Sequence, residues 1–240
     1  MAGTKALLLA GGLGTRLRPL TLTIPKCLIP VAGKPMLDYW LDALEVAEIS
    51  EALLNTHHLR DEVKIWLDTA NSSRSVTITE AYEPDLLGSA GTVTANRDWA
   101  EDADAIVVIY ADNLSTIDLH SFLAFHHAHG DPMSMALFHT PYPKACGIAT
   151  LDDEARIVDF VEKPEHPASD LANAGLYVLD GKAWREIADM EAFDFGFDVL
   201  PRFVGRMRGY VHDGYHRDIG TPEALAQAEA DAPGLTWPAP

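Results

Sequence analysis

A glycine-rich turn followed by two basic residues is the part of this sequence best suited to chemistry. Residues 5–10 form a short apolar run, and after it come three closely spaced glycines, Gly11, Gly12 and Gly14. Glycine lets successive backbone N–H groups face phosphate oxygens at close range. Arg16 and Lys26 add a fork of donors and a compact positive charge. The spacing predicts a phosphate-binding site at the end of a buried strand.

Two common glycine motifs do not fit this turn. A dinucleotide-binding G-x-G-x-x-G that began at the second glycine would need glycine where Leu17 stands, and Pro19 interrupts the helix that should follow. A P-loop would need Ser or Thr after Gly33 and Lys34, but Pro35 occupies that position. A turn that only reverses the chain would not explain an Arg and a Lys in the same loop.

An acidic residue follows the most apolar segment of the chain. Residues 105–110 read AIVVIY, which predicts a central strand buried on both faces, and Asp112 comes just after it. Ligands of open α/β sheets bind beyond the carboxyl ends of the strands, and Mg²⁺ takes a few carboxylate oxygens. Asp112 is therefore a candidate metal ligand, although the local pattern alone also fits a turn residue.

The longer motifs resemble those of one family, the sugar-1-phosphate nucleotidylyltransferases. Residues 11–35 resemble its signature GGxGTRLxPLT followed by PKxLxPVxGKP. Further segments match in the family's order: LLGSAGTV at 86–93, YADN at 110–113, VEKP at 161–164, NAGLY at 173–177 and HRDIGTP at 216–222. Within the family, the likeness is strongest to short bacterial mannose-1-phosphate or heptose-1-phosphate guanylyltransferases.

The resemblance implies an α/β fold, a Rossmann-like three-layer sandwich with a mostly parallel mixed sheet of the glycosyltransferase-A-like type. We expect a single domain over residues 1–232 and a frayed C-terminal tail at 233–240. The implied reaction moves a nucleoside monophosphate from a nucleoside triphosphate to a sugar 1-phosphate and releases pyrophosphate, with Mg²⁺ as cofactor. The sugar could be mannose, a heptose or a longer-chain aldose.

The resemblance also implies roles for individual residues. The catalytic residues would be Arg16 at the triphosphate, Lys26 at the reacting phosphates and Asp112, which would share Mg²⁺ with Asp218. The nucleotide-binding residues would be Leu9, Gly11, Gly12, Gly14, Thr15, Arg16, Glu83 and Gly88. The residues at the sugar 1-phosphate would be Gly147, Glu162, Lys163 and Asn173. Without the resemblance, Asp218 would be a helix cap or a solvated loop acid, and the Glu162-Lys163 pair would be an ordinary solvated pair.

The residue five positions before Gly88 bears on the choice of base. Pyrimidine-specific relatives carry Gln at this position, whereas this chain has Glu83. An ionised carboxylate only accepts hydrogen bonds, and guanine presents N–H donors where uracil and thymine present two carbonyls. Glu83 therefore favours GTP, unless its side chain points to solvent. The alternatives are a uridylyl- or thymidylyltransferase acting on a hexose 1-phosphate, and a non-catalytic relative that binds sugar nucleotides as a regulatory subunit.

The composition excludes several other classes of protein. The 240 residues include 18 Lys and Arg against 36 Asp and Glu, a net charge of −18, which argues against a nucleic-acid partner or an anionic membrane surface. Two cysteines are too few for a disulfide framework, and no apolar run is long enough to span a membrane. We expect a cytoplasmic enzyme with small-molecule substrates, which could form a homo-oligomer. The histidines lack the spacing of a zinc site.

Apolar periodicity predicts alternating strands and helices. Strands are expected at 5–10, 52–55, 76–79, 105–110, 133–139, 156–161 and 176–179. Helices are expected from Pro35 onward, at about 60–68, up to residue 93, at 183–188 and at 222–230. A Ser-rich turn is expected at 71–75. The helix after Pro35 should bury Met36, Leu37, Trp40, Leu41 and Leu44.

Overall fold

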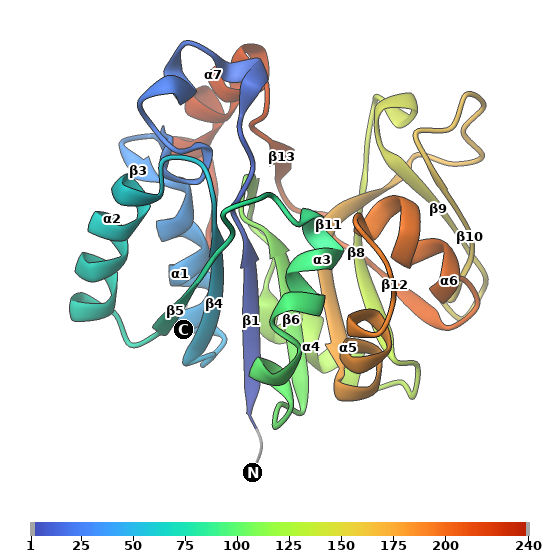
Figure 1. Ribbon diagram of the computed structural model, residues 1–240. Helices are drawn as coiled ribbons and strands as arrows, with labels where there is room; N and C mark the ends of the chain where they lie inside the picture. Colours follow the sequence, from blue (N-terminus) through green and yellow to red (C-terminus); the bar gives the residue numbers. More distant parts are fainter. Residues whose placement is uncertain (1–2, 239–240) are drawn as a thin grey trace. The chain divides into compact units, whose positions relative to one another are not determined.

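The computed structural model describes residues 3–238, and the chain divides into two units (Figure 1). Unit 2 contains Lys5–Leu86, Ile109–His120 and Gly214–Pro240. Unit 1 contains Leu87–Val108 and Ser121–Asp213, together with Gly3 and Thr4. Each unit therefore gathers stretches that are distant in sequence. The single domain expected over residues 1–232 stays a prediction.

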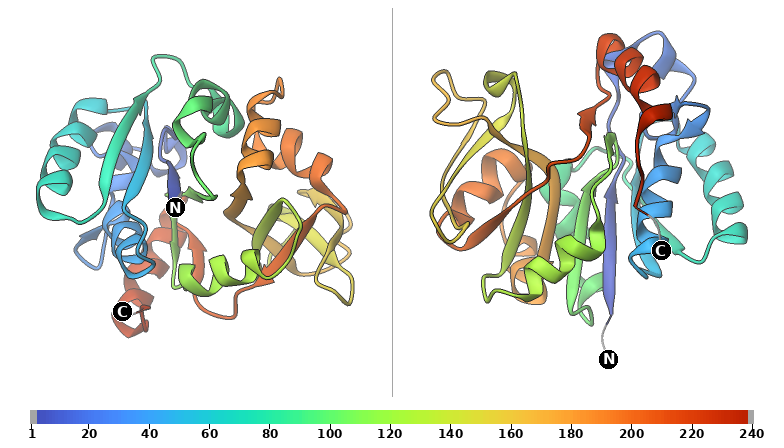
Figure 2. Two further views of the ribbon diagram at one scale, coloured as in Figure 1. Left: turned by 90° about the horizontal axis from the view of Figure 1, so that it is seen from below. Right: turned by 180° about the vertical axis from the view of Figure 1, so that it is seen from behind.

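Unit 2 is built on three parallel strands. Their order is β1, β4 and β5, with bounds Thr4–Leu9, Glu51–Thr56 and Thr77–Tyr82. The Leu-rich stretches of β1 and β4 are buried on both faces, as parallel strands between covering layers require. The connections between successive strands are α1 (Met36–Val46) and α2 (Arg60–Ser73). Both helices lie on the same side of the strands, as the left panel of Figure 2 shows.

Helices α1 and α2 differ in how well the sequence predicted them. The five residues expected on the apolar face of α1 are the five that it buries. Helix α2, however, continues through Ser73, where a turn was expected. The hydroxyls of Ser72 and Ser73 donate to the carbonyl of Thr69 at 2.7 and 2.9 Å. The serines thus satisfy their own hydrogen bonds inside the helix, and they do not end it.

A second layer of unit 2 holds the glycine-rich segment in place. After β1 the chain makes three single-turn 3₁₀ helices and a short hairpin: η1 (Thr15–Leu17), η2 (Leu20–Leu22), η3 (Lys26–Leu28), β2 (Pro30–Val31) and β3 (Lys34–Pro35). Two more short strands, β7 (Asn113–Ser115) and β13 (His216–Asp218), pair in antiparallel fashion. Helix α7 (Pro222–Asp231) follows, capped by the side chain of Thr221, and lies beside the glycine-rich segment in Figures 1 and 2.

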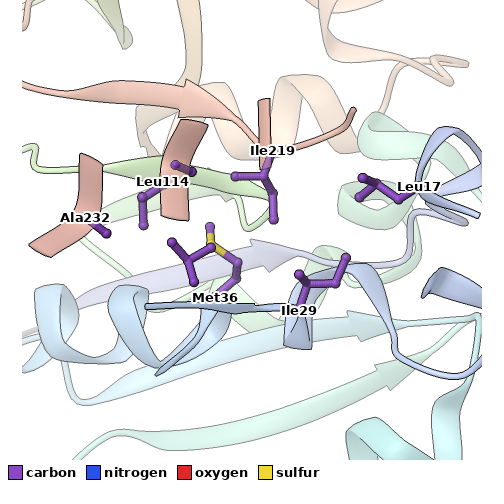
Figure 3. Packing of buried hydrophobic residues seen from close by; sticks show 8 residues of the cluster. Leu17, Ile29, Met36, Leu114, Ile219 and Ala232 are labelled. Atoms are coloured by element: carbon purple, nitrogen blue, oxygen red, sulfur yellow. The ribbon is translucent and has the colours of Figure 1, made fainter. Parts of the chain in front are cut away.

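One buried cluster joins these pieces. It takes side chains from the segment after the glycine turn, from α1, β7 and α7, and from the residues that follow β13 and α7: Leu17, Ile29, Val31, Met36, Leu114, Ile219, Ala228 and Ala232 (Figure 3). Leu235 and Trp237 pack against the same cluster, just after η7 (Ala232–Gly234). They belong to the tail expected to fray, of which residues 239–240 lie outside the described residues. The cluster fixes the ends of β7 and β13 relative to the glycine-rich segment.

Unit 1 contains a mixed sheet. Its strands are β6 (Ala105–Tyr110, of which the last two residues belong to unit 2), β8 (Met133–His139), β9 (Gly147–Leu151), β10 (Ile157–Glu162), β11 (Leu171–Asp180) and β12 (Met207–Val211). Strand β11 pairs in antiparallel fashion with β8 and β9, β9 does so with β10, and β12 is parallel to β8. The sequence did not predict β9 and β12. Both are short, and their apolar pattern is broken by glycine or arginine.

Helical segments of unit 1 connect and cover these strands. The α-helices are α3 (Gly88–Ala95), α4 (Leu119–His127, which starts in unit 2), α5 (Gly181–Ala188) and α6 (Leu200–Phe203). The shorter turns are η4 (Arg97–Ala100), η5 (Pro143–Ala145) and the π-helical turn η6 (Phe195–Val199). Within residues 3–238, no helix is both long and apolar enough to cross a membrane.

Candidate active site

Lys26 lies between two carboxylates in unit 2. Its Nζ contacts Oδ2 of Asp112 and lies 3.3 Å from Oδ1 of Asp218, and only 8% of its side chain is exposed. Asp112 follows β6, while Asp218 ends β13. The pairing of β7 and β13 places Asp218 opposite Asn113, and the amide of Ile219 donates to the carbonyl of Asp112 at 3.3 Å. Backbone pairing therefore brings together two acids from distant parts of the chain.

The two acids keep Lys26 charged. Burial alone would lower the pKa of its ammonium group, but the charges of Asp112 and Asp218 and their hydrogen bonds outweigh burial, so the pKa is raised. Lys26 thus carries a positive charge in a nearly closed position. The neighbouring Cys27 behaves differently, because burial raises the pKa of its thiol to about 12. A thiol that stays protonated is no nucleophile.

Arg16 lies at the open side of this cluster. Its Nη2 is 3.6 Å from Oδ2 of Asp218, and 64% of its side chain is exposed. The amide of Gly220 donates to Oδ1 of Asp218 at 2.7 Å. A Cβ at Gly220 would come within 2.5 Å of Nη2 of Arg16 and 3.1 Å of Nζ of Lys26. The absence of a side chain at Gly220 therefore lets the two cations and the acid approach one another.

Gly14 and Gly12 contribute to the turn in different ways. Gly14 has a φ of +58°, and a Cβ there would lie 2.7 Å from Cγ2 of Thr21, whose hydroxyl donates to the carbonyl of Gly14 at 2.8 Å. A Cβ at Gly12 would meet nothing within 4 Å. Gly14 thus sets the backbone and Gly12 leaves open space. Thr15 begins η1 and is exposed.

A buried asparagine lies under the start of the turn. Oδ1 of Asn55 accepts from the amides of Ala10 and Gly11 at 2.6 and 3.1 Å, and its Nδ2 donates to Oε1 of Glu83 at 3.1 Å. Glu83 is only 2% exposed. The alternative in which Glu83 points to solvent is therefore wrong. The same end of β1 also binds the residue before Asp112, because the carbonyl of Leu9 accepts from the amide of Ala111 at 3.0 Å.

Unit 1 holds the residues expected at the sugar 1-phosphate. The Glu162 side chain is 17% exposed, whereas Lys163, with Nζ 3.8 Å from Oε1 of Glu162, is 60% exposed. Burial and the charge of Asp194 raise the pKa of Glu162, and Lys163 only partly opposes them. A Cβ at Gly147 would lie 2.5 Å from Oε2 of Glu162 and 2.6 Å from the ring of Phe160. Gly147 thus leaves room for a carboxylate and a ring of the protein itself, and its contact with a sugar 1-phosphate stays a prediction.

Asn173 is held within β11. Its Nδ2 donates to the hydroxyl of Tyr177 at 2.7 Å, and its Oδ1 accepts from the amide of Gly175 at 2.9 Å. These bonds bridge the irregularity in β11 between Asn173 and Tyr177. Tyr177 stacks on Phe195, with ring centroids 5.1 Å apart. A role of Asn173 toward a sugar stays a prediction.

A carboxylate that the sequence did not single out lies near Glu162. A Cβ at Gly196 would be 3.0 Å from Oε2 of Glu162 and 3.2 Å from Oδ1 of Asp194, so both acids approach the same glycine. Asp194 precedes η6 and accepts from the amide of Phe197 at 3.1 Å. Only the tertiary fold shows this proximity, because nothing in the local pattern links these residues.

Gly88 also belongs to unit 1. It begins α3 with a φ of +80°, and a Cβ there would lie 2.3 Å from the carbonyl oxygen of Phe193. The same carbonyl accepts from the amide of Ala90 at 3.0 Å. Packing against residue 193 therefore explains why glycine is needed, and contact of Gly88 with a nucleotide stays a prediction.

Comparison with known proteins identifies the family. A family model described as "Nucleotidyl transferase" matches residues 5–233. The chain belongs to the nucleotidyl transferase family. The resemblance that the sequence motifs indicated is thereby confirmed.

Two relatives of this nucleotidyl transferase have the same named activity. A mannose-1-phosphate guanylyltransferase of Mycobacterium tuberculosis is 34% identical over 230 residues, which cover 94% of this chain and 64% of that protein. Mannose-1-phosphate guanylyltransferase 1 of Arabidopsis thaliana is 31% identical over 223 residues, which cover 91% of this chain and 62% of that protein. The chain thus spans less than two thirds of the length of these relatives.

Solved structures confirm the fold of this nucleotidyl transferase. A Bacillus anthracis protein assigned as a glucose-1-phosphate thymidylyltransferase superimposes with a TM-score of 0.83 at 25% identity, covering 99% of this chain and 98% of that one. A UDP-glucose pyrophosphorylase complexed with UDP-glucose gives 0.83 at 21% identity, covering 98% and 99%. The expected α/β fold, with a mixed sheet and flanking helices, is confirmed.

The acids of this nucleotidyl transferase fit a magnesium ion. Asp112 and Asp218 both reach Nζ of Lys26, and 31% and 53% of their side chains are exposed. Two hard carboxylates open to solvent suit Mg²⁺, which keeps several waters and takes other ligands from substrate phosphates. Residues 3–238 contain no group of three or more His, Cys, Asp or Glu side chains close enough together to hold a metal ion. A closed site made by the protein alone is therefore absent from the described residues.

Proposed function

We propose that this nucleotidyl transferase transfers a nucleoside monophosphate, preferably from GTP, to a sugar 1-phosphate. The phosphate oxygen of the sugar attacks the α-phosphorus of the triphosphate, a new phosphorus–oxygen bond forms, and the bond to the leaving pyrophosphate breaks. The observation that carries this proposal is the convergence of Lys26, Asp112, Asp218 and Arg16 beyond the glycine-rich turn. Family membership and the names of the relatives support it.

Repulsion between anions is the main obstacle to this reaction, because both substrates carry phosphate charge. The open backbone at Gly12 and the exposed guanidinium of Arg16 would bind the triphosphate. Lys26, held protonated, would offset charge that develops at the reacting phosphates. Mg²⁺, which Asp112 and Asp218 would hold, supplies charge neutralisation and aligns phosphate oxygens.

The guanine preference rests on Glu83. Its carboxylate is buried beside the glycine-rich turn, and a carboxylate can accept hydrogen bonds from guanine N–H groups but cannot donate to the carbonyls of uracil. The relatives named mannose-1-phosphate guanylyltransferase support the same base and make mannose 1-phosphate the first sugar to test. Heptose 1-phosphates are the next.

The sugar 1-phosphate would meet Glu162 and Lys163. The exposed ammonium group of Lys163 can pair with the phosphate, while the partly buried Glu162 carboxylate can accept from sugar hydroxyls. A purely regulatory binding protein would not need a buried lysine between two acids, so the intact Lys26 cluster favours an enzyme over the non-catalytic alternative.

A pyrophosphate-release assay tests this proposal. The purified chain is assayed with GTP, ATP, UTP, CTP and dTTP, each against mannose, heptose, glucose and N-acetylglucosamine 1-phosphates, with and without Mg²⁺. We expect pyrophosphate only with Mg²⁺ and a sugar 1-phosphate together, and the highest kcat/KM with GTP. A clear preference for dTTP or UTP would contradict the guanine assignment, and no release with any pair would contradict the activity.

A further inference from the structure

A single amide joins the two parts of the nucleotide site in unit 2. Asn55 is the fifth residue of the six in β4, and it is only 4% exposed. One end of its side chain binds the backbone that enters the glycine-rich turn, at Ala10 and Gly11. The other end binds the carboxylate of Glu83, which follows β5. The proposed function assigns the turn to the triphosphate and Glu83 to the base.

The orientation of the Asn55 amide follows from its partners. The amides of Ala10 and Gly11 can only donate, so the group that faces them must be the carbonyl oxygen of Asn55. Its NH₂ group then faces Glu83, which as a carboxylate accepts. Both ends of the amide are thus matched, and reversing it would place donors against donors. Asn55 is chemically specified at this position.

The backbone of Glu83 is held as well. Its amide donates to the carbonyl of Thr56 at 2.8 Å, and its carbonyl oxygen lies 2.8 Å from Nδ1 of His57. With the main chain fixed at the end of β4, the direction of the carboxylate depends on side-chain torsions, which the hydrogen bond from Asn55 restricts. A Cβ at Gly11 would lie 3.0 Å from Nδ2 of Asn55, so the turn also packs directly on this amide.

We propose that Asn55 is a positioning residue for nucleobase selectivity. Its amide holds the Glu83 carboxylate in a fixed direction relative to the glycine-rich turn. The group that binds the base and the backbone that binds the triphosphate of the same nucleotide therefore keep a fixed position relative to each other. Asn55 acts through Glu83 and the turn, without touching the nucleotide. This inference rests on the proposed function, in which Glu83 accepts from guanine.

The decisive variant is Asn55→Asp. It keeps an oxygen for the amides of Ala10 and Gly11 but replaces the donor to Glu83 with a second carboxylate, which repels the first. We expect the ratio of kcat/KM for GTP to kcat/KM for UTP to fall by about tenfold, the factor for one lost hydrogen bond of about 1.4 kcal/mol. KM for the sugar 1-phosphate should be unchanged.

A double variant tests the link itself. In Glu83→Gln the amide oxygen at position 83 still accepts from Asn55, so only base reading changes. When Asn55→Asp is added to Glu83→Gln, the hydrogen bond can form in the reverse direction, from position 83 to position 55. The double variant should therefore show the same GTP/UTP ratio as Glu83→Gln alone, within about twofold, so the two changes should be non-additive.

A matched control is Asn71→Asp. Asn71 also uses both ends of its amide, but on backbone alone: it accepts from the amide of Ile78 at 2.8 Å and donates to the carbonyl of Ile78 at 3.0 Å. It lies in α2, away from the turn, so the GTP/UTP ratio should stay as in the wild type. Thermal unfolding of each variant shows whether it folds, and calorimetric Kd values for GTP and UTP give the same ratio if turnover is lost.

The outcomes separate this inference from the proposed function. A lower GTP/UTP ratio in Asn55→Asp, restored to the Glu83→Gln value in the double variant, supports the inference. An equal loss with GTP and UTP, leaving the ratio unchanged, overturns it and makes Asn55 a structural support of the turn. If the wild type shows no preference for GTP in either kcat/KM or Kd, the base assignment in the proposed function fails, and this inference fails with it.

Discussion

Asp218 lies opposite Asn113 in the pairing of β13 with β7, and this places its carboxylate beside that of Asp112. The register of two three-residue strands thus determines whether the acids can act together. Because the two acids lie side by side, Nζ of Lys26 can contact both carboxylates. The short strands are in turn held by the buried cluster shown in Figure 3.

Replacing Lys26 tests the charge between the acids. Lys26→Met keeps the length of the side chain and removes its charge, so we expect kcat to fall on the order of 10²- to 10³-fold. The fold should persist, because methionine can occupy a nearly closed position. The control is Lys34→Met, whose ammonium group pairs with Asp42; its kcat should stay near wild type. A folded Lys26→Met variant with normal kcat would contradict the assigned role.

Replacing Asp112 tests metal binding separately from turnover. Asp112→Asn removes one of two carboxylates, and we expect calorimetric Mg²⁺ affinity in the presence of GTP to fall by tenfold or more, with a similar loss in kcat. Asp68→Asn changes an exposed acid on α2 and should affect neither quantity. Unaltered Mg²⁺ affinity in a folded Asp112→Asn variant would rule out Asp112 as a ligand.

A side chain at Gly220 should displace Arg16 and Asp218 from their present positions. In Gly220→Ala the methyl group would lie 2.5 Å from Nη2 of Arg16 and 2.8 Å from Oδ1 of Asp218, so these groups must move apart. Because Arg16 is assigned to the triphosphate, we expect KM for GTP to rise by about tenfold, the effect of weakening one charged hydrogen bond. Steady-state kinetics measures KM for GTP in Gly220→Ala and in the control Gly234→Ala, where a Cβ meets nothing within 4 Å. Equal KM values in the two variants would be inconsistent with this role.

Gly147 should matter for both stability and the sugar substrate. A methyl group there would lie 2.5 Å from Oε2 of Glu162 and 2.6 Å from the Phe160 ring. We expect Gly147→Ala to cost about 1–3 kcal/mol in the free energy of unfolding, the usual range for overpacking, and to raise KM for the sugar 1-phosphate. Urea unfolding measures the loss of stability, and steady-state kinetics measures KM for the sugar 1-phosphate. The control is Gly130→Ala, because a Cβ at Gly130 meets nothing within 4 Å. A rise in KM for GTP alone would argue against Glu162 as a sugar-binding group.

His126 should make the protein less stable in acid. Burial lowers the pKa of His126 to about 4. The neighbouring His129 and His127 also lower this pKa, and Asp180 opposes them. The unfolded chain, with an ordinary pKa near 6.5, then binds the proton more readily. The contribution of His126 is therefore fully present above about pH 6.5 and is lost as the pH falls toward 4, by at most roughly 3 kcal/mol.

Urea unfolding at pH 7 and pH 4.5 measures this effect. The wild type should lose more stability between these pH values than His126→Gln, whose side chain can still bond with Ser134, the partner of Nδ1 of His126 at 2.9 Å. Identical losses in the two proteins would show that His126 does not titrate in this range.

The parts of the site that the sequence predicted are those encoded by local patterns. The apolar run before the glycines forms β1, and the AIVVIY segment forms a buried strand that ends just before Asp112. Five apolar positions at helical spacing give the buried face of α1. In each case the residues that determine the element lie within one short window.

The parts that the sequence did not predict depend on contacts between distant residues. Asn55 looks like any polar residue at the end of a buried strand until the fold places it under Gly11 and beside Glu83. The approach of Asp194 to Glu162 depends on a π-helical turn after residue 194 that no periodicity reveals. The placement of these side chains therefore depends on packing between residues that are distant in sequence, and no local sequence pattern shows such packing.

Phosphorus-31 NMR of the reaction of GTP with mannose 1-phosphate and Mg²⁺ tests the central claim most directly. Attack at the α-phosphorus predicts that the resonances of a sugar-linked diphosphate and of free pyrophosphate grow in equal amounts, and that Lys26→Met slows both together. Formation of GDP and inorganic phosphate, or of pyrophosphate without a sugar-linked product, would contradict the account.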